Sequence, residues 1–149
     1  MNGDEAPVIL AREWIEKAEN DLINAQHALT LGKNCPADTV CFHAQQCVEK
    51  YLKALLTFMA IDFPKTHEIA RLMNLLPRKV QPELAPEEQG KLTDYATVTR
   101  YPGDYIPVML RDAREAVKIA RRVRKEIRQL LPKAALRRRQ APGFPARLS

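Results

Sequence analysis

The sequence is poor in glycine and in aromatic residues. Its 149 residues include 5 Gly, 4 Phe, 4 Tyr and 1 Trp, whereas Ala, Leu, Lys, Glu and Arg are abundant. Such a composition is typical of a helical protein. No stretch alternates apolar and polar residues, as a half-buried strand would. We therefore predict an all-α fold, and the length fits a single domain with one core.

Cysteines and long apolar runs are also scarce. The 3 Cys form an odd, irregularly spaced set, which fits reduced thiols in a reducing cytoplasm better than disulfides. The first residues are acidic and have no apolar core before Ala11, unlike a signal peptide. No apolar run approaches the roughly 18 residues that span a membrane. We expect a cytoplasmic protein that does not contact membranes.

Motifs that bind common cofactors are missing. The sequence has no GxGxxG, GxxxxGK or GxSxG segment, which argues against a dinucleotide site, a P-loop and a hydrolase elbow. His43 and Cys47 share a helix face, yet no CxxC and no second His pair completes a four-ligand metal site. We expect neither a cofactor nor a metal.

The most regular stretch runs from Asp38 to Ile61 and contains neither Gly nor Pro. Its apolar residues recur at steps of three and four, which predicts one long amphipathic helix. Such a helix is roughly 30 Å long, so we expect it to cross the whole domain with the other helices packed around it. Polar residues follow the same steps on its other face and predict a single polar ridge: His43, Gln46, Lys50 and Lys53.

Local signals predict where this helix and its neighbours end. Asp38 or Thr39 can cap the start of the long helix, and Pro64 requires that the helix ends before it. Gly32 is expected to stop the preceding helix.

Helical periodicity elsewhere predicts a bundle of four or five helices that run up and down. Prolines interrupt the chain between the segments. We divide the chain into a flexible leader (1–10), one helical domain (11–131) and a basic, disordered tail (132–149).

The net charge of +6 is unevenly distributed. Residues 111–149 carry 13 Lys and Arg against 3 Asp and Glu, whereas residues 1–110 carry 11 against 15. A basic last helix can attract a polyanion through phosphate contacts and counterion release, although a solvated helix face explains the same pattern. The basic residues of this helix include Arg111, Arg114, Lys118, Arg121, Arg122, Lys125 and Arg128.

Three segments together resemble the HEPN family of helical domains: AQQCVEKYLKALL (44–56), PKTHEIARLMNLL (64–76) and the RYP that begins at Arg100. With the opening WIEKAENDLINA, the resemblance covers 13–131. It implies a five-helix bundle that often dimerises. It further implies a small protein whose gene frequently lies beside that of a minimal nucleotidyltransferase. It also implies links to nucleotide or RNA binding and to toxin–antitoxin pairs. The chain has no GS-type nucleotidyltransferase motif, so any nucleotidyl transfer would belong to a partner.

Many RNA-cutting members of this family carry an Arg about four to six residues before a His, and these two groups hold the phosphate and move a proton. This sequence departs from that pattern. Its histidines are His27, His43 and His67, and the nearest preceding Arg is Arg12, fifteen residues before His27. We therefore expect a binding module and assign no catalytic residue. An endoribonuclease toxin that uses His67 with a distant Arg is one alternative, and a structural protein-interaction module is another.

Four candidate phosphate-binding residues lie on or near the long helix. An imidazole at a helix start can exchange protons near neutral pH, Lys ammonium groups can neutralise phosphate, and an amide can bind the polar edge of a base. A capping role for the imidazole and a solvated ridge for the lysines are the alternatives. The candidates are Gln46, Lys50, Lys53 and His67.

Arg100 and Tyr101 complete the candidate site. A guanidinium can hold a phosphate, and an aromatic ring can stack on a base. A structural role, with Tyr101 in the core and Arg100 paired to an acid, is equally compatible with the sequence.

Overall fold

α2 (Ala37–Phe58) lies at the centre of the molecule, as the unbroken pattern predicts. The computed structural model describes residues 5–97 and 107–138, and within these ranges every regular element is helical. The all-α prediction is confirmed. The other elements are α1 (Glu5–Leu29), α3 (Ile69–Leu75), α4 (Pro86–Tyr95), α5 (Leu110–Leu130), α6 (Lys133–Leu136) and the 3₁₀ turns η1 (Gly32–Asn34) and η2 (Arg78–Val80).

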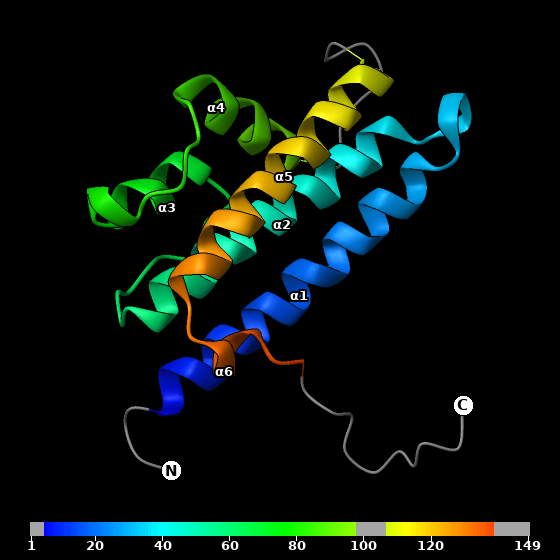
Figure 1. Ribbon diagram of the computed structural model, residues 1–149. Helices are drawn as coiled ribbons and strands as arrows, with labels where there is room; N and C mark the ends of the chain where they lie inside the picture. The colour runs from blue at the N-terminus through cyan, green and yellow to red at the C-terminus, as the bar shows by residue number, and fades with distance from the viewer. Residues whose placement is uncertain (1–4, 98–106, 139–149) are drawn as a thin grey trace, which may run out of the picture.

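The long helices α1, α2 and α5 run side by side, and α3 and α4 lie across one side of α2 (Figure 1). α5 begins at the same end of the molecule as α2, because α3 and α4 together return the chain to that end. α2 packs against α1, α3, α4 and α5 and supplies several of the largest fully buried side chains of the core, Tyr51, Leu52, Leu55 and Leu56. No helix in the described ranges is long and apolar enough to cross a membrane.

The turn between α1 and α2 follows the prediction. α1 ends at Leu29, and Gly32 adopts a φ of 58°, a left-handed conformation that glycine tolerates without steric cost. The predicted cap of α2 is wrong. The N-cap residue is Pro36, and the Asp38 carboxylate accepts the amide of Thr39 over 2.8 Å within the first turn instead.

α2 ends well before Pro64. Ala60 has a φ of 58°, the amide of Ile61 donates to Leu56 O over 2.9 Å, and the amide of Ala60 donates to Thr57 O over 3.0 Å. These two bonds form a Schellman motif, which satisfies the last carbonyl groups of the helix. The motif reverses the chain and sends it toward α3.

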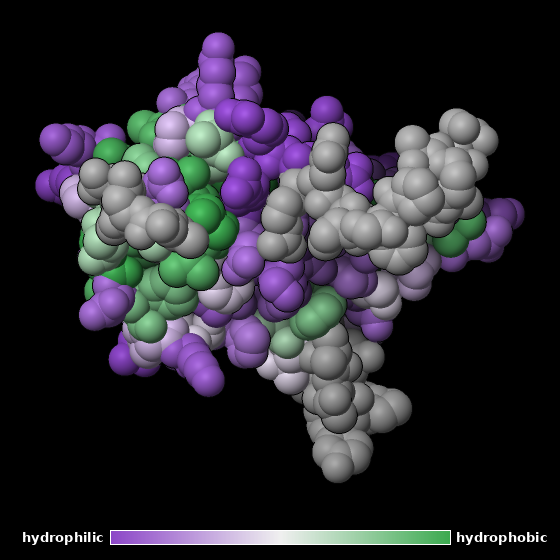
Figure 2. Space-filling model, turned by 90° about the horizontal axis from the view of Figure 1, so that it is seen from below, coloured by the Kyte–Doolittle hydropathy of each residue, from purple (hydrophilic) through white to green (hydrophobic). Residues whose placement is uncertain are grey.

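The first helix starts earlier than the domain division anticipates. Within the segment assigned to a flexible leader (1–10), α1 begins at Glu5, and Val8 packs against the core. Leu10, on the same turn, is 50% exposed. Figure 2 shows a hydrophobic area on the face of the molecule that carries this end of α1. Val8 gains packing free energy when this segment is helical, so the segment is part of α1 and not a flexible leader.

The start of the segment assigned to a disordered tail (132–149) is also ordered. α6 packs against α1, and Ala135 is completely buried. A guanidinium nitrogen of Arg12 donates to Ala134 O over 3.4 Å. The short helix therefore belongs to the folded domain, because it closes the core at one end of α1.

Candidate functional site

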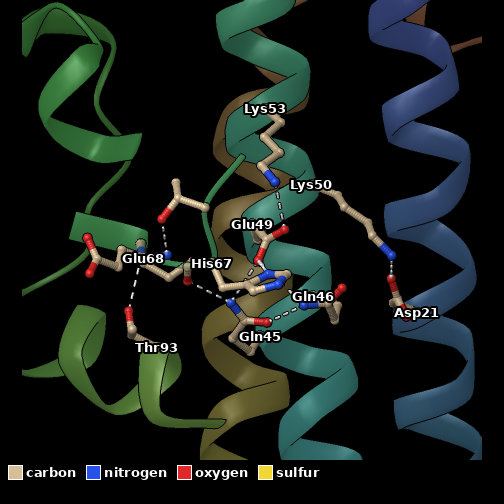
Figure 3. Close-up of polar contacts among 11 residues, drawn as sticks. Asp21, Gln45, Gln46, Glu49, Lys50, Lys53, His67, Glu68 and Thr93 are labelled. Carbon is tan, nitrogen blue, oxygen red and sulfur yellow. Dashed lines mark hydrogen bonds and ion pairs between the residues drawn. The ribbon is translucent and has the colours of Figure 1, made fainter. Parts of the chain in front are cut away.

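A buried carboxylate, that of Glu49 on α2, is the centre of the candidate site (Figure 3). Only 3% of its side chain is exposed. Its Oε2 accepts Lys53 Nζ over 2.9 Å, and its Oε1 bonds to His67 Nδ1 over 2.8 Å. The amide nitrogen of Gln45 also donates to Oε1, over 3.1 Å. With Gln46 included, four polar side chains converge on one acid.

The balance of burial and hydrogen bonding keeps Glu49 ionised. Burial alone would raise the pKa of Glu49, but the hydrogen bonds from Lys53, His67 and Gln45 and the charge of Lys53 outweigh it and lower the pKa below its ordinary value. An ionised carboxylate can only accept hydrogen bonds, so Nδ1 of His67 must carry the proton in their contact. The other ring nitrogen, Nε2, is left without a bond to Glu49.

The imidazole of His67 is exposed over 67% of its side chain, although its Nδ1 bonds to a buried acid. The backbone around it is anchored: His67 O accepts the amide of Gln45 over 3.2 Å, and the hydroxyl of Thr66 accepts the backbone amide of Glu68 over 3.1 Å. One residue further on, the first amide of α3 donates to the Thr93 hydroxyl on α4 over 3.0 Å. The ring is therefore held in one orientation at the surface.

Lys53, one helical turn after Glu49 on α2, is itself buried, with 8% of its side chain exposed. Its ammonium lies 5.4 Å from the ring centroid of Trp14 and 5.9 Å from that of Phe63. These two rings pack edge to face, with centroids 6.2 Å apart. Cation–π attraction and the ion pair with Glu49 together compensate the burial of the ammonium. In this structure Lys53 neutralises Glu49 and does not face solvent.

Lys50 points away from this cluster, toward α1 (Figure 3). Its Nζ bonds to Oδ2 of Asp21 over 2.6 Å, and Nδ1 of His43 bonds to Oδ1 of the same carboxylate over 2.8 Å. The predicted polar ridge on α2 is therefore divided between two acids. His43 and Lys50 pair with Asp21 on α1, whereas Lys53 pairs with Glu49 on its own helix.

Gln46 joins the cluster around Glu49. Its amide nitrogen donates to Oε1 of Gln45 over 2.6 Å and lies 3.4 Å from Oε1 of Glu49. Of the candidate residues, the structure brings Gln46, Lys53 and His67 together around Glu49, whereas Lys50 pairs with Asp21. Arg100 and Tyr101 lie outside the described residues.

Sequence reasoning missed the two acids and Gln45, which is completely buried. One signal was available, because Gln45, Glu49 and Lys53 follow one another at four-residue steps and so share one row of the helix. Within 5–97 and 107–138, no group of three or more His, Cys, Asp or Glu side chains is arranged to hold a metal ion.

The fold and the site define a small helical bundle in which a buried acid holds an exposed imidazole. A family model described as the HEPN domain matches residues 11–130, and the chain belongs to that family. The comparison with curated proteins finds no match.

Two solved structures share the fold. The crystal structure of TT1696 from Thermus thermophilus is 29% identical with a TM-score of 0.67, covering 81% of this chain and 98% of that one. The crystal structure of ST0689, an archaeal HEPN homologue, is also 29% identical, with a TM-score of 0.60 over 80% of this chain and 96% of that one.

Proposed function

We propose that this protein is a HEPN-family binding module that takes the phosphate of a nucleotide or of an RNA end at His67. It would act with a separately encoded minimal nucleotidyltransferase, in a toxin–antitoxin pair. The observation that carries the binding proposal is the exposed imidazole of His67, whose Nδ1 bonds to the buried carboxylate of Glu49 over 2.8 Å.

The charges of the cluster favour an anion. Glu49 and Lys53 neutralise each other, so protonation of His67 gives the site a net charge of +1 at the only strongly exposed member of the three. Nε2–H can then donate a charge-assisted hydrogen bond to a phosphate oxygen. The fixed ring orientation reduces the entropy lost on binding. Arg100 and Tyr101 would add a guanidinium for phosphate and a ring for base stacking.

Calorimetric titration with ATP tests this proposal. His67→Gln removes the imidazole. We expect the affinity of this variant for ATP to be roughly tenfold to a hundredfold lower than that of the wild type, because one hydrogen bond to a charged group is lost. His27→Gln is the matched control, because His27 is an exposed imidazole on α1, and its affinity should stay at the wild-type value. Absence of binding to the wild type, or equal losses in both variants, would reject the site.

The partnership has its own test. A reading frame for a small nucleotidyltransferase with a GS motif should lie beside the one that encodes this chain, and the two proteins should copurify after coexpression. Growth arrest by this chain alone, relieved by the partner, would support the toxin–antitoxin assignment. Free growth and no complex would contradict it.

A second candidate function is metal-independent RNA cleavage, which the ordered Glu49–His67 pair favours. A base held in place by a third group is the arrangement that general acid–base catalysis uses. This candidate expects RNA cleavage in the presence of EDTA that His67→Gln abolishes and His27→Gln preserves. Intact RNA after incubation with the wild type would exclude it.

A further inference from the structure

The cations of α5 fall into two sets. Those of the first set are partly buried, and each contacts a partner on another element, so their charge is used within the fold. Arg122 bonds to Glu88 over 2.7 Å, Arg124 bonds to both oxygens of Glu19 over 2.7 and 2.9 Å, and Arg128 bonds to the Tyr51 hydroxyl over 3.3 Å.

The second set forms what we call the α5 ridge. Its members are all exposed, and none makes a hydrogen bond or ion pair with another described residue. They are separated by three, four, three and four residues, which places them in one row about 21 Å long. The α5 ridge consists of Arg111, Arg114, Lys118, Arg121 and Lys125.

The composition of the α5 ridge indicates what kind of partner it fits. A protein partner would require an apolar or aromatic centre, and charged residues are depleted there. The ridge contains only cations, and Glu115 is the single exposed acid on α5. Neighbouring cations on one helix row repel each other, and a polyanion relieves that repulsion.

We propose that the α5 ridge binds the phosphate backbone of a nucleic acid strand, without reading its sequence. Backbone contacts by Lys and Arg need neither an aromatic platform nor a groove, and they gain free energy by releasing counterions. The ridge lies on α5, whereas His67 lies in the connection between α2 and α3, and the ridge does not depend on the function proposed for that site.

The test is fluorescence anisotropy of a labelled single-stranded RNA, and of DNA of the same sequence, over a range of NaCl concentrations. The variant R114Q/K118Q/R121Q removes the central three charges of the ridge. The control K17Q/K33Q/K91Q removes three exposed charges on α1, η1 and α4, so both proteins have the same net charge.

We expect the ridge variant to reduce the slope of log K against log salt by about 2, since each lost contact on a single strand contributes roughly 0.7. Its affinity near 0.1 M salt should then be about a hundredfold lower on either strand, with the control close to wild type. Equal losses of affinity in both variants would show attraction by net charge alone and would overturn the proposal. A ridge variant that binds with wild-type affinity and salt dependence would also overturn it. Titration with ATP separates the two sites, because the ridge variant should keep wild-type affinity for it.

Discussion

At the scale of single residues, two acids on neighbouring helices each hold one histidine and one lysine. Asp21 and Glu49 have the same kinds of partner, but their surroundings differ. Lys50, which bonds to Asp21, is 21% exposed, whereas Lys53, which bonds to Glu49, is 8% exposed. Water screens the first cluster more than the second, so removal of one partner should destabilise the protein more in the second.

Replacement of Glu49 by Gln tests how much stability the protein loses when the acid of the buried cluster is removed. The substitution keeps the shape but leaves the Lys53 ammonium buried without a counter-charge, which typically costs about 3 kcal/mol or more. We expect the free energy of unfolding, measured with urea, to fall by about that amount. Glu87→Gln on α4 removes an exposed carboxylate and should change it by less than about 0.5 kcal/mol. Equal effects would mean that Glu49 is more hydrated than the structure indicates.

The stability difference between the wild type and Glu49→Gln should depend on pH. Folding lowers the pKa of Glu49 below 4.5, so its ionised form stabilises the fold above that value. As the pH falls through the folded-state pKa, the carboxylate is protonated and the contribution is lost. The difference between the wild type and Glu49→Gln should be constant from neutral pH to about 5 and should shrink below 4.5. A constant difference down to pH 3 would contradict the role of ionisation.

Single-residue reasoning from the sequence identified His67 but not Glu49. A histidine beside a helix start is visible in the chain itself, whereas the burial of Glu49 depends on the connection to α3 folding over α2. Lys53 shows the same difference. Its spacing indicated an outward ridge, but Trp14 and Phe63, which come from distant segments, enclose its ammonium.

At the scale of helices, the boundaries set by local patterns were predictable and those set by distant partners were not. Gly32 stops the chain after α1 through its own conformational freedom. The start of α3 depends on Thr93, which lies 24 residues later and supplies its hydroxyl to the backbone amide of Ile69. No local motif reports such a cap, because only the packing of α4 against α3 brings it into place.

The end of α2 provides a stability prediction. Ala60 adopts a φ of 58°, which costs an L-residue with a Cβ about 1 to 2 kcal/mol, and glycine avoids this cost. Ala60→Gly also gains unfolded-state entropy, which cancels part of the benefit. We expect the variant to be more stable by about 0.5 to 1 kcal/mol in thermal or urea unfolding.

Ala70→Gly is the matched control for this prediction. Ala70 is exposed within α3, where glycine is unfavourable, so the same substitution should destabilise the protein by about 1 kcal/mol. A loss of stability in both variants would contradict the left-handed conformation of Ala60.

At the scale of the whole molecule, the separation of charge was visible in the sequence, but its use was not. The basic last helix was predicted as one set of seven cations. In the structure, Arg122 and Arg128, together with Arg124, bind groups on other elements, and the remaining cations face outward. Helical steps alone could not separate the two sets, because the partners come from α1, α2 and α4.

This arrangement predicts that the α5 ridge reduces the stability of the free protein. Four successive like-charged pairs lie along the row, and each costs roughly 0.2 to 0.5 kcal/mol, partly offset by Glu115. R114Q/K118Q/R121Q should therefore unfold at higher urea concentration than the wild type, with a gain of about 0.5 to 1 kcal/mol at low salt. The gain should vanish near 1 M NaCl, where charges more than about 3 Å apart are screened.

The control K17Q/K33Q/K91Q should show no comparable gain, because its charges are dispersed over three elements. A ridge variant that is less stable at low salt would mean that these cations support the fold, and the loss of nucleic acid binding would then need a different explanation.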